Sequence, residues 1–220
     1  MPEECPVRAK LTSSDDPISA LKSASEAVLN AYWNDKDVAT CKRNAKTAIA
    51  WGLEHADALG DDENKSDILG AVKPIAYNLA SFLWTGWDEP GIVLAPGDHA
   101  IGEEAALLNL RLAAELRRDA IAQCRAHWLV GAFRLTANDY AAARETFAHA
   151  ARFAEDGDGP ADAALNRAYA ALAAVFENGR SQEFIDVYTS ALDALANVED
   201  GADYVVQVKK AEKVVSREHA

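Results

Sequence analysis

The 220-residue sequence has three cysteines, one methionine and no long apolar run. Cys5, Cys41 and Cys124 are odd in number and widely spaced, which argues against a disulfide framework or a paired metal–thiolate motif. No segment approaches the roughly 18 consecutive apolar residues of a membrane-spanning helix, and the N-terminus lacks the apolar core of a signal peptide. We therefore expect a cytoplasmic protein in which Cys41 and Cys124 are small, buried apolar side chains.

Basic residues are also scarce relative to acidic ones. Lys and Arg number 22 against 35 Asp and Glu, which gives a formal net charge of −13. Such a surface repels phosphate backbones and anionic lipid, so neither nucleic acid nor a membrane is an expected partner. The acidity fits three interpretations, which are solubility alone, a preference for basic partners, and a salt-adapted source.

Strong helix formers dominate the sequence, while runs of Val, Ile and Thr are nearly absent, so the predicted fold class is all-α. The length allows one substantial core, and we expect a flexible lead-in over 1–15 and a single domain over 16–220. Pro74 is expected to kink its helix or to mark its start. Apolar spacing of three and four residues predicts helices over about 17–34, 38–59, 65–86, 98–116, 117–137, 139–155, 160–178, 181–196 and 202–217.

One pattern of small and bulky residues recurs along these helices. Its clearest copy places Gly131 on one helix and Tyr140, Ala143, Phe147 and Ala150 on the next. Small residues let two helices of a hairpin approach closely, and a single hairpin must stack on others to bury its face. Fainter copies are carried by Ala31, Tyr32, Cys41 and Ala48, by Tyr77, Leu79, Ala106, Leu110 and Ala113, and by Gly179, Phe184, Tyr188, Ala191 and Leu192.

This pattern resembles the tetratricopeptide repeat in a degenerate form, over roughly residues 20–197. The copies lie farther apart than the family period of about 34 residues, and the usual tryptophan and closing proline are mostly missing. A generic α-α bundle is the alternative. The resemblance implies an α-α superhelix of about four stacked helical hairpins, with a C-terminal capping helix.

In tetratricopeptide arrays, the first helix of each hairpin lines a concave groove that binds peptides. The resemblance therefore implies an adaptor or scaffold that binds a protein or peptide through aromatic and amide side chains. The alternative is that these aromatics only pack between hairpins. Carried over to this sequence, the groove residues are Asn30, Trp33, Tyr77, Asn78, Trp84, Arg125, Trp128, Tyr169 and Phe176.

The segment from Trp84 to Gly97 is the longest irregular stretch and is unusually apolar for a loop. It must cover either this protein's core or a partner, and Trp87 is the candidate residue within it. A regulatory helical domain that binds a small ligand beneath residues 84–97 is therefore the alternative function.

Residues able to carry out chemistry are isolated in this sequence. The five histidines lack metal-ligand partners at helical spacing, and no glycine-rich phosphate loop is present. His127 lies one helical turn from Cys124, but packing explains both. We expect no catalysis, no metal and no cofactor. The terminal helix, with Tyr204, Val205, Val208 and Val215, either caps the array or forms a homodimer.

Overall fold

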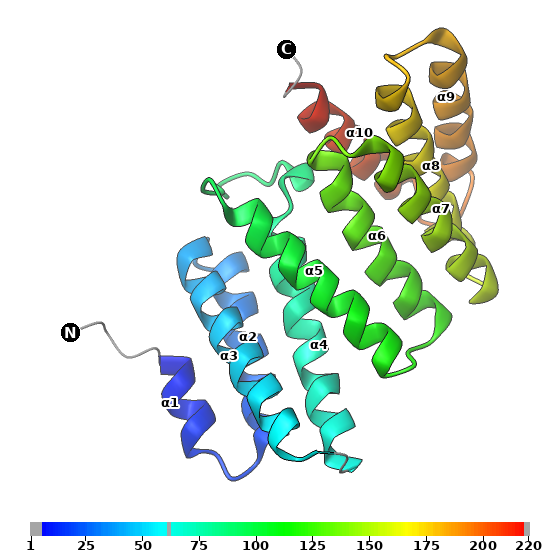
Figure 1. The fold of residues 1–220 in the computed structure, drawn as a ribbon. Helices are drawn as coiled ribbons and strands as arrows, with labels where there is room; N and C mark the ends of the chain where they lie inside the picture. The colour runs from blue at the N-terminus through cyan, green and yellow to red at the C-terminus, as the bar shows by residue number, and fades with distance from the viewer. Residues whose placement is uncertain (1–5, 61–62, 218–220) are drawn as a thin grey trace. The chain divides into compact units, whose positions relative to one another are not determined.

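The structure is a computed structural model that describes residues 6–60 and 63–217. Within these ranges the chain folds into ten α-helices and one 3-10 helix, with no strand (Figure 1). The all-α class predicted from the sequence is therefore confirmed. The helices are α1 (Pro6–Ser13), α2 (Pro17–Trp33), α3 (Val38–Ala58), α4 (Glu63–Leu83), η1 (Thr85–Trp87), α5 (Asp98–Glu115), α6 (Ala120–Thr136), α7 (Tyr140–Asp156), α8 (Pro160–Glu177), α9 (Gln182–Ala196) and α10 (Gly201–Arg217).

Aspartate side chains begin several of these helices. The Asp16 carboxylate accepts hydrogen bonds from the backbone amides of Ile18 and Ser19, at 3.0 and 3.1 Å. Asp37 accepts one from Thr40 at 2.9 Å, and this bond is the main reason that the pKa of Asp37 is lowered. These carboxylates satisfy amides that the first helical turn leaves unpaired.

At its C-terminal end, a helix of this chain is commonly followed by a residue with positive φ. This left-handed conformation lets the chain reverse direction while its amide groups bond back to the last turn. Glycine adopts it without strain, but most of these positions hold other residues. Those that are not glycine are Lys36, Asp88, Arg117, Asn138, Asp158, Arg180 and Asp200.

The contacts divide the chain into two compact units, Met1–Leu83 with Pro90–Leu116, and Trp84–Glu89 with Arg117–Ala220. In unit 1, α2 packs on α3, α3 packs on α4, and α4 packs on α5. Helix α4 also packs on α2, and α1 packs on α2 and α3. In unit 2, α6, α7, α8 and α9 follow one another in the same way, and α8 also packs on α6. Each unit thus contains neighbouring helical hairpins in contact. A single domain over 16–220 stays a prediction.

The best copy of the sequence pattern shows why small and bulky residues alternate. Gly131 of α6 faces the ring of Phe147 on α7, and a Cβ added at Gly131 would lie 2.8 Å from that ring. Phe147 is fully buried and stacks on Tyr169 of α8, with ring centroids 5.0 Å apart. Three successive helices therefore meet through one glycine and two aromatic rings.

One local prediction was wrong. Within the expected flexible lead-in, residues 6–13 form α1, and its Val7 and Leu11 are buried. These residues are four apart, so they share one face of the helix. Helix α4 continues through Pro74, whose ring lies on the exposed side, so Pro74 does not mark its start, and the expected kink stays a prediction. Residues 1–5 of the lead-in lie outside the described part of the chain.

Candidate peptide-binding surface

The predicted groove residues on α6 and α8 belong to unit 2, and their exposure differs widely. Trp128 of α6 is 5% exposed, and Tyr169 of α8 is fully buried. Arg125 is exposed and pairs with Asp162 at 3.4 Å. Phe176 is half-buried and stacks on Tyr140. The two large central side chains are therefore covered in this conformation.

Three tryptophans and a tyrosine form an aromatic cluster in unit 2. The ring centroid of Trp84 lies 5.1 Å from that of Trp87, 5.5 Å from Trp128 and 6.3 Å from Tyr169. The indole nitrogen of Trp84 donates a hydrogen bond to the carbonyl oxygen of Ala132 at 2.9 Å. Trp84 is fully buried and Trp87 is half-buried, so both contribute to packing within the unit.

Helix α10 is what covers this part of unit 2. It packs against α6, α8, α9 and η1, and the side-chain amide of Gln207 donates to the Tyr169 hydroxyl at 3.1 Å. Val208, Ala211 and Val215 form the buried face of the helix. Among the residues that the sequence assigns to a groove on α6 and α8, Tyr169 is thus in direct contact with the chain's own C-terminal helix.

Polar contacts hold the second half of α10 in place. Tyr188 of α9 donates to Glu212 at 3.1 Å, and Arg180 lies 3.8 Å from the same carboxylate. Arg217 reaches Asp88, which follows η1, at 3.4 Å. These contacts are partly exposed, so each adds little stability by itself and mainly fixes the position of the helix.

On α6 and α8, two buried polar atoms have no hydrogen-bond partner within the described chain. They are the indole nitrogen of Trp128 and the side-chain oxygen of Asn166. The Asn166 amide nitrogen, in contrast, donates to the Asp162 carbonyl at 2.8 Å and to the Cys124 sulfur at 3.3 Å. A buried donor or acceptor left unpaired costs about 1–3 kcal/mol. The polar groups of α6 and α8 are therefore incompletely paired in this conformation.

The remaining predicted groove residues lie in unit 1, on α2 and α4, which are in contact. Asn30 and Trp33 of α2 are exposed, Trp33 by 51%, whereas Tyr77 and Asn78 of α4 are half-buried. The Trp33 ring packs edge-on against Phe82 of α4, with centroids 5.7 Å apart. Unit 1 thus presents its predicted residues on an accessible surface, unlike unit 2.

The groups that could carry chemistry are arranged for packing. Burial raises the pKa of Cys41 and of Cys124 to about 12, so both thiols stay protonated at neutral pH. Their burial confirms the prediction that they are small core residues. His127 instead contacts His149, with ring centroids 4.5 Å apart. Cys5 lies outside the described residues. Within the described part, no group of three or more His, Cys, Asp or Glu side chains is placed to hold a metal ion.

The fold defines an all-α protein with packed helical hairpins in each of two units. No family model, curated protein or solved structure matches the chain. None of the helices in residues 6–60 and 63–217 combines the length and apolarity needed to cross a membrane. The burial of Trp128 and Tyr169 was not predicted from the sequence. The apolar stripe of α10 at Val208, Ala211 and Val215 was the signal that this helix packs on the chain.

Proposed function

We propose that this protein is a protein-binding module, an adaptor or scaffold of tetratricopeptide-like hairpins without catalytic activity. Its binding surface is the face of α6 and α8 that contains Trp128, Asn166 and Tyr169. One observation carries the proposal. An amphipathic helix, α10, is already packed against η1, α6, α8 and α9, and its apolar side chains Val208, Ala211 and Val215 are buried.

The chemistry of α10 indicates the kind of partner. Its outer face is basic, because the helix carries four Lys and Arg residues against two acidic ones. The chain as a whole has a net charge of −13, so a basic segment is attracted to it. We therefore propose a basic, amphipathic helical segment of another protein as the ligand, docked by the helix-in-groove mode.

A partner segment must compete with α10 for the same surface. The two unpaired polar atoms of Trp128 and Asn166 favour a segment that offers an acceptor to the first and a donor to the second. Each recovered bond contributes about 1 kcal/mol. Only molecules in which α10 is undocked can bind the partner. A docked α10 therefore lowers the measured affinity for the partner and acts as an internal competitor.

Fluorescence anisotropy of a labelled peptide with the sequence of residues 201–217 tests this proposal. A chain ending at Asp200 should bind the peptide saturably, whereas the full chain should bind it at least about tenfold more weakly because α10 is docked. The matched control peptide carries Val208→Asp and Val215→Asp and should not bind.

A second variant keeps the test valid if the truncated chain misfolds. In the full chain, Val208→Asp places a charge on the buried face of α10 and should release the helix without shortening the chain. Circular dichroism establishes that each variant stays helical. A helical variant with its C-terminal helix removed or released that fails to bind the peptide would refute the proposed surface.

The exposed surface around Trp33 in unit 1 is a second candidate surface for peptide binding. The alternative of a small ligand beneath residues 84–97 gains no support, because Trp84 and Trp87 pack with Trp128.

A further inference from the structure

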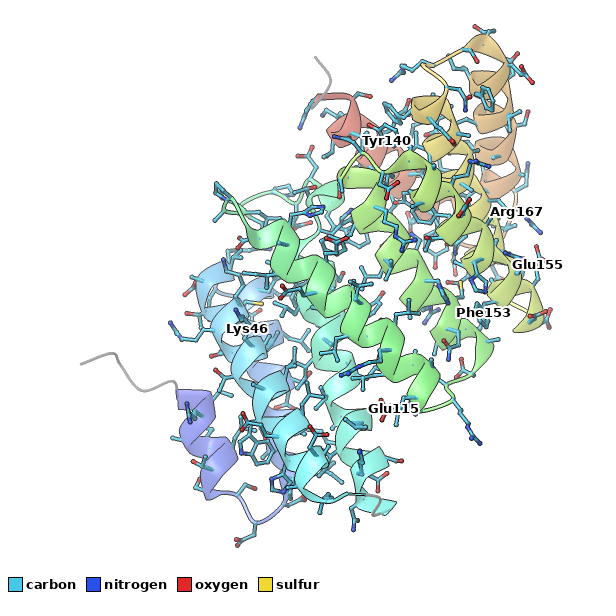
Figure 2. All side chains as sticks on the ribbon, in the orientation of Figure 1. Lys46, Glu115, Tyr140, Phe153, Glu155 and Arg167 are labelled. Atoms are coloured by element: carbon cyan, nitrogen blue, oxygen red, sulfur yellow. The ribbon has the colours of Figure 1, made fainter. Side chains whose placement is uncertain are left out.

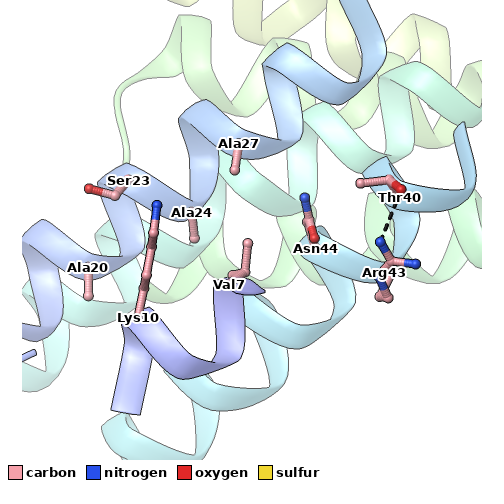
Figure 3. Close-up of a pocket in the computed structure, with 9 residues that line it drawn as sticks. All are labelled: Val7, Lys10, Ala20, Ser23, Ala24, Ala27, Thr40, Arg43 and Asn44. Atoms are coloured by element: carbon pink, nitrogen blue, oxygen red, sulfur yellow. Dashed lines mark hydrogen bonds between the residues drawn. The ribbon is translucent and has the colours of Figure 1, made fainter. Parts of the chain in front are cut away.

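A cavity of about 170 Å³ lies in unit 1, between α1, α2 and α3 (Figure 3). Its size is close to that of the engineered apolar cavity of about 150 Å³ that holds benzene. The apolar part of its lining consists of Val7 on α1 and Ala20, Ala24 and Ala27 on α2. The space therefore fits a compact group of several carbon atoms.

The cavity exists because short side chains face one another there. Three alanines at offsets of three and four residues present a flat strip of α2, and α1 is only two turns long. Val7 is buried beside this strip, but a valine is too small to fill the remaining volume. The space is partly open to solvent, because Lys10, Ser23 and Arg43 of its lining are exposed.

The charged part of the lining is cationic. Lys10 of α1 and Arg43 of α3 line the cavity, and no Asp or Glu is among its lining residues. Figure 3 shows these two cations at opposite ends of the space, with Val7 and Asn44 between them. Asn44 is only 6% exposed. In a chain with a net charge of −13, a site lined by two cations and no acid selects for an anion.

We propose that this cavity binds a small carboxylate with an apolar body. The hydrocarbon part lies on Ala20, Ala24 and Ala27, and the carboxylate is held by Arg43 or Lys10 through charge-assisted hydrogen bonds. The buried Asn44 amide supplies a fixed polar contact that orients the ligand. The site belongs to unit 1 and does not depend on peptide binding by unit 2.

Isothermal titration calorimetry with hexanoate tests the proposal in the full chain. Saturable binding in the millimolar range or tighter is expected, and hexanamide, which has the same shape but no charge, should bind at least about fivefold more weakly. Raising the salt concentration should weaken hexanoate binding, because Lys10 and Arg43 are both exposed to solvent.

Matched variants locate the ligand. Either Lys10→Met or Arg43→Met, whichever removes the cation that holds the carboxylate, should weaken hexanoate binding by about fivefold. The controls Lys46→Met and Arg8→Met remove one exposed charge from α3 and α1, respectively, at positions that do not line the cavity, and should have little effect (Lys46 is labelled in Figure 2).

Filling the cavity gives an independent readout. Ala24→Leu should abolish hexanoate binding while circular dichroism stays helical, and the smaller change Ala27→Val serves if the first variant does not fold. The proposal is overturned if hexanoate shows no saturable binding or if hexanamide binds equally well. It is also overturned if the control variants weaken binding as much as the more damaging of Lys10→Met and Arg43→Met.

Discussion

Replacement of Gly131 by alanine tests the close helix packing on which unit 2 depends. Two effects of opposite sign compete. Alanine is favoured over glycine within a helix by about 1 kcal/mol, which would stabilise α6. However, the added Cβ would lie 2.8, 2.9 and 3.1 Å from three ring carbons of Phe147. Carbon atoms in contact normally stay about 3.5–4.0 Å apart, so the ring has to move.

The ring has little room to move. Phe147 is fully buried and stacks on Tyr169, with an angle of 20° between the ring planes. Overpacking of a tight core costs about 1–3 kcal/mol, which exceeds the gain in helix propensity. We therefore expect Gly131→Ala to lower the free energy of unfolding by about 1 kcal/mol and Tm by about 2–4 °C.

Urea unfolding followed by tryptophan fluorescence measures this effect, and a double mutant decides its cause. In a Phe147→Leu background the smaller side chain leaves space for the Cβ, so Gly131→Ala should become neutral or stabilising. Ala148→Gly, at an exposed position of α7, serves as the control for helix propensity alone. A stabilisation of about 1 kcal/mol by Gly131→Ala in the native background would refute the reasoning.

Two further predictions concern titratable groups. Burial, followed by the charge of His149, lowers the pKa of His127 to about 4. The unfolded ring gains its proton near pH 6.5 and the folded ring only near pH 4, so this ring makes stability fall as the pH drops through that window. His127→Phe should reduce the loss of unfolding free energy between about pH 7 and pH 5 by roughly 1 kcal/mol, after allowance for the partly exposed ring; an unchanged loss in urea unfolding would contradict this. In a Cys5→Ser variant, Cys41 and Cys124 should react with a thiol reagent at neutral pH only on unfolding, and rapid native labelling would show that they are accessible.

Much of the helix pattern is predictable from residues at helix starts and at close contacts between neighbouring helices. Asp16 before Pro17 signals a helix start, and Asp37 caps the next helix as its position suggests. The spacing of Gly131 and Phe147 likewise predicted a hairpin, because it places the glycine of one helix opposite the aromatic ring of the next. Such signals lie within a few residues of the feature that they determine.

Packing overrides a local signal at two places. Pro74 lacks the backbone donor of a helix interior, yet α4 continues through it, since Val72 before it and Ile75 after it are both buried. The burial of these flanking side chains offsets the lost bond. For α1, the spacing of Val7 and Leu11 was readable, but the neighbouring polar residues and prolines outweighed it.

The burial of Trp128 and Tyr169 could not be predicted from local sequence signals. Trp128 and Tyr169 stand at positions where the tetratricopeptide resemblance expects accessible side chains. The Tyr169 hydroxyl accepts a hydrogen bond from Gln207 of α10, 38 residues beyond it along the chain, and the Trp128 ring packs on Trp84 and Trp87. An apolar stripe shows that a helix packs on something, but only the folded chain shows on what.

The five tryptophans have different environments in the two units, so their spectroscopic signals report on each unit separately. Trp84, Trp87 and Trp128 touch one another in unit 2, whereas Trp33 and Trp51 belong to unit 1 and are at least partly open to solvent. Coupled indoles contribute to near-ultraviolet circular dichroism, while solvent-facing indoles emit at longer wavelength. One denaturation series recorded with both signals therefore distinguishes joint melting of the two units from melting in sequence.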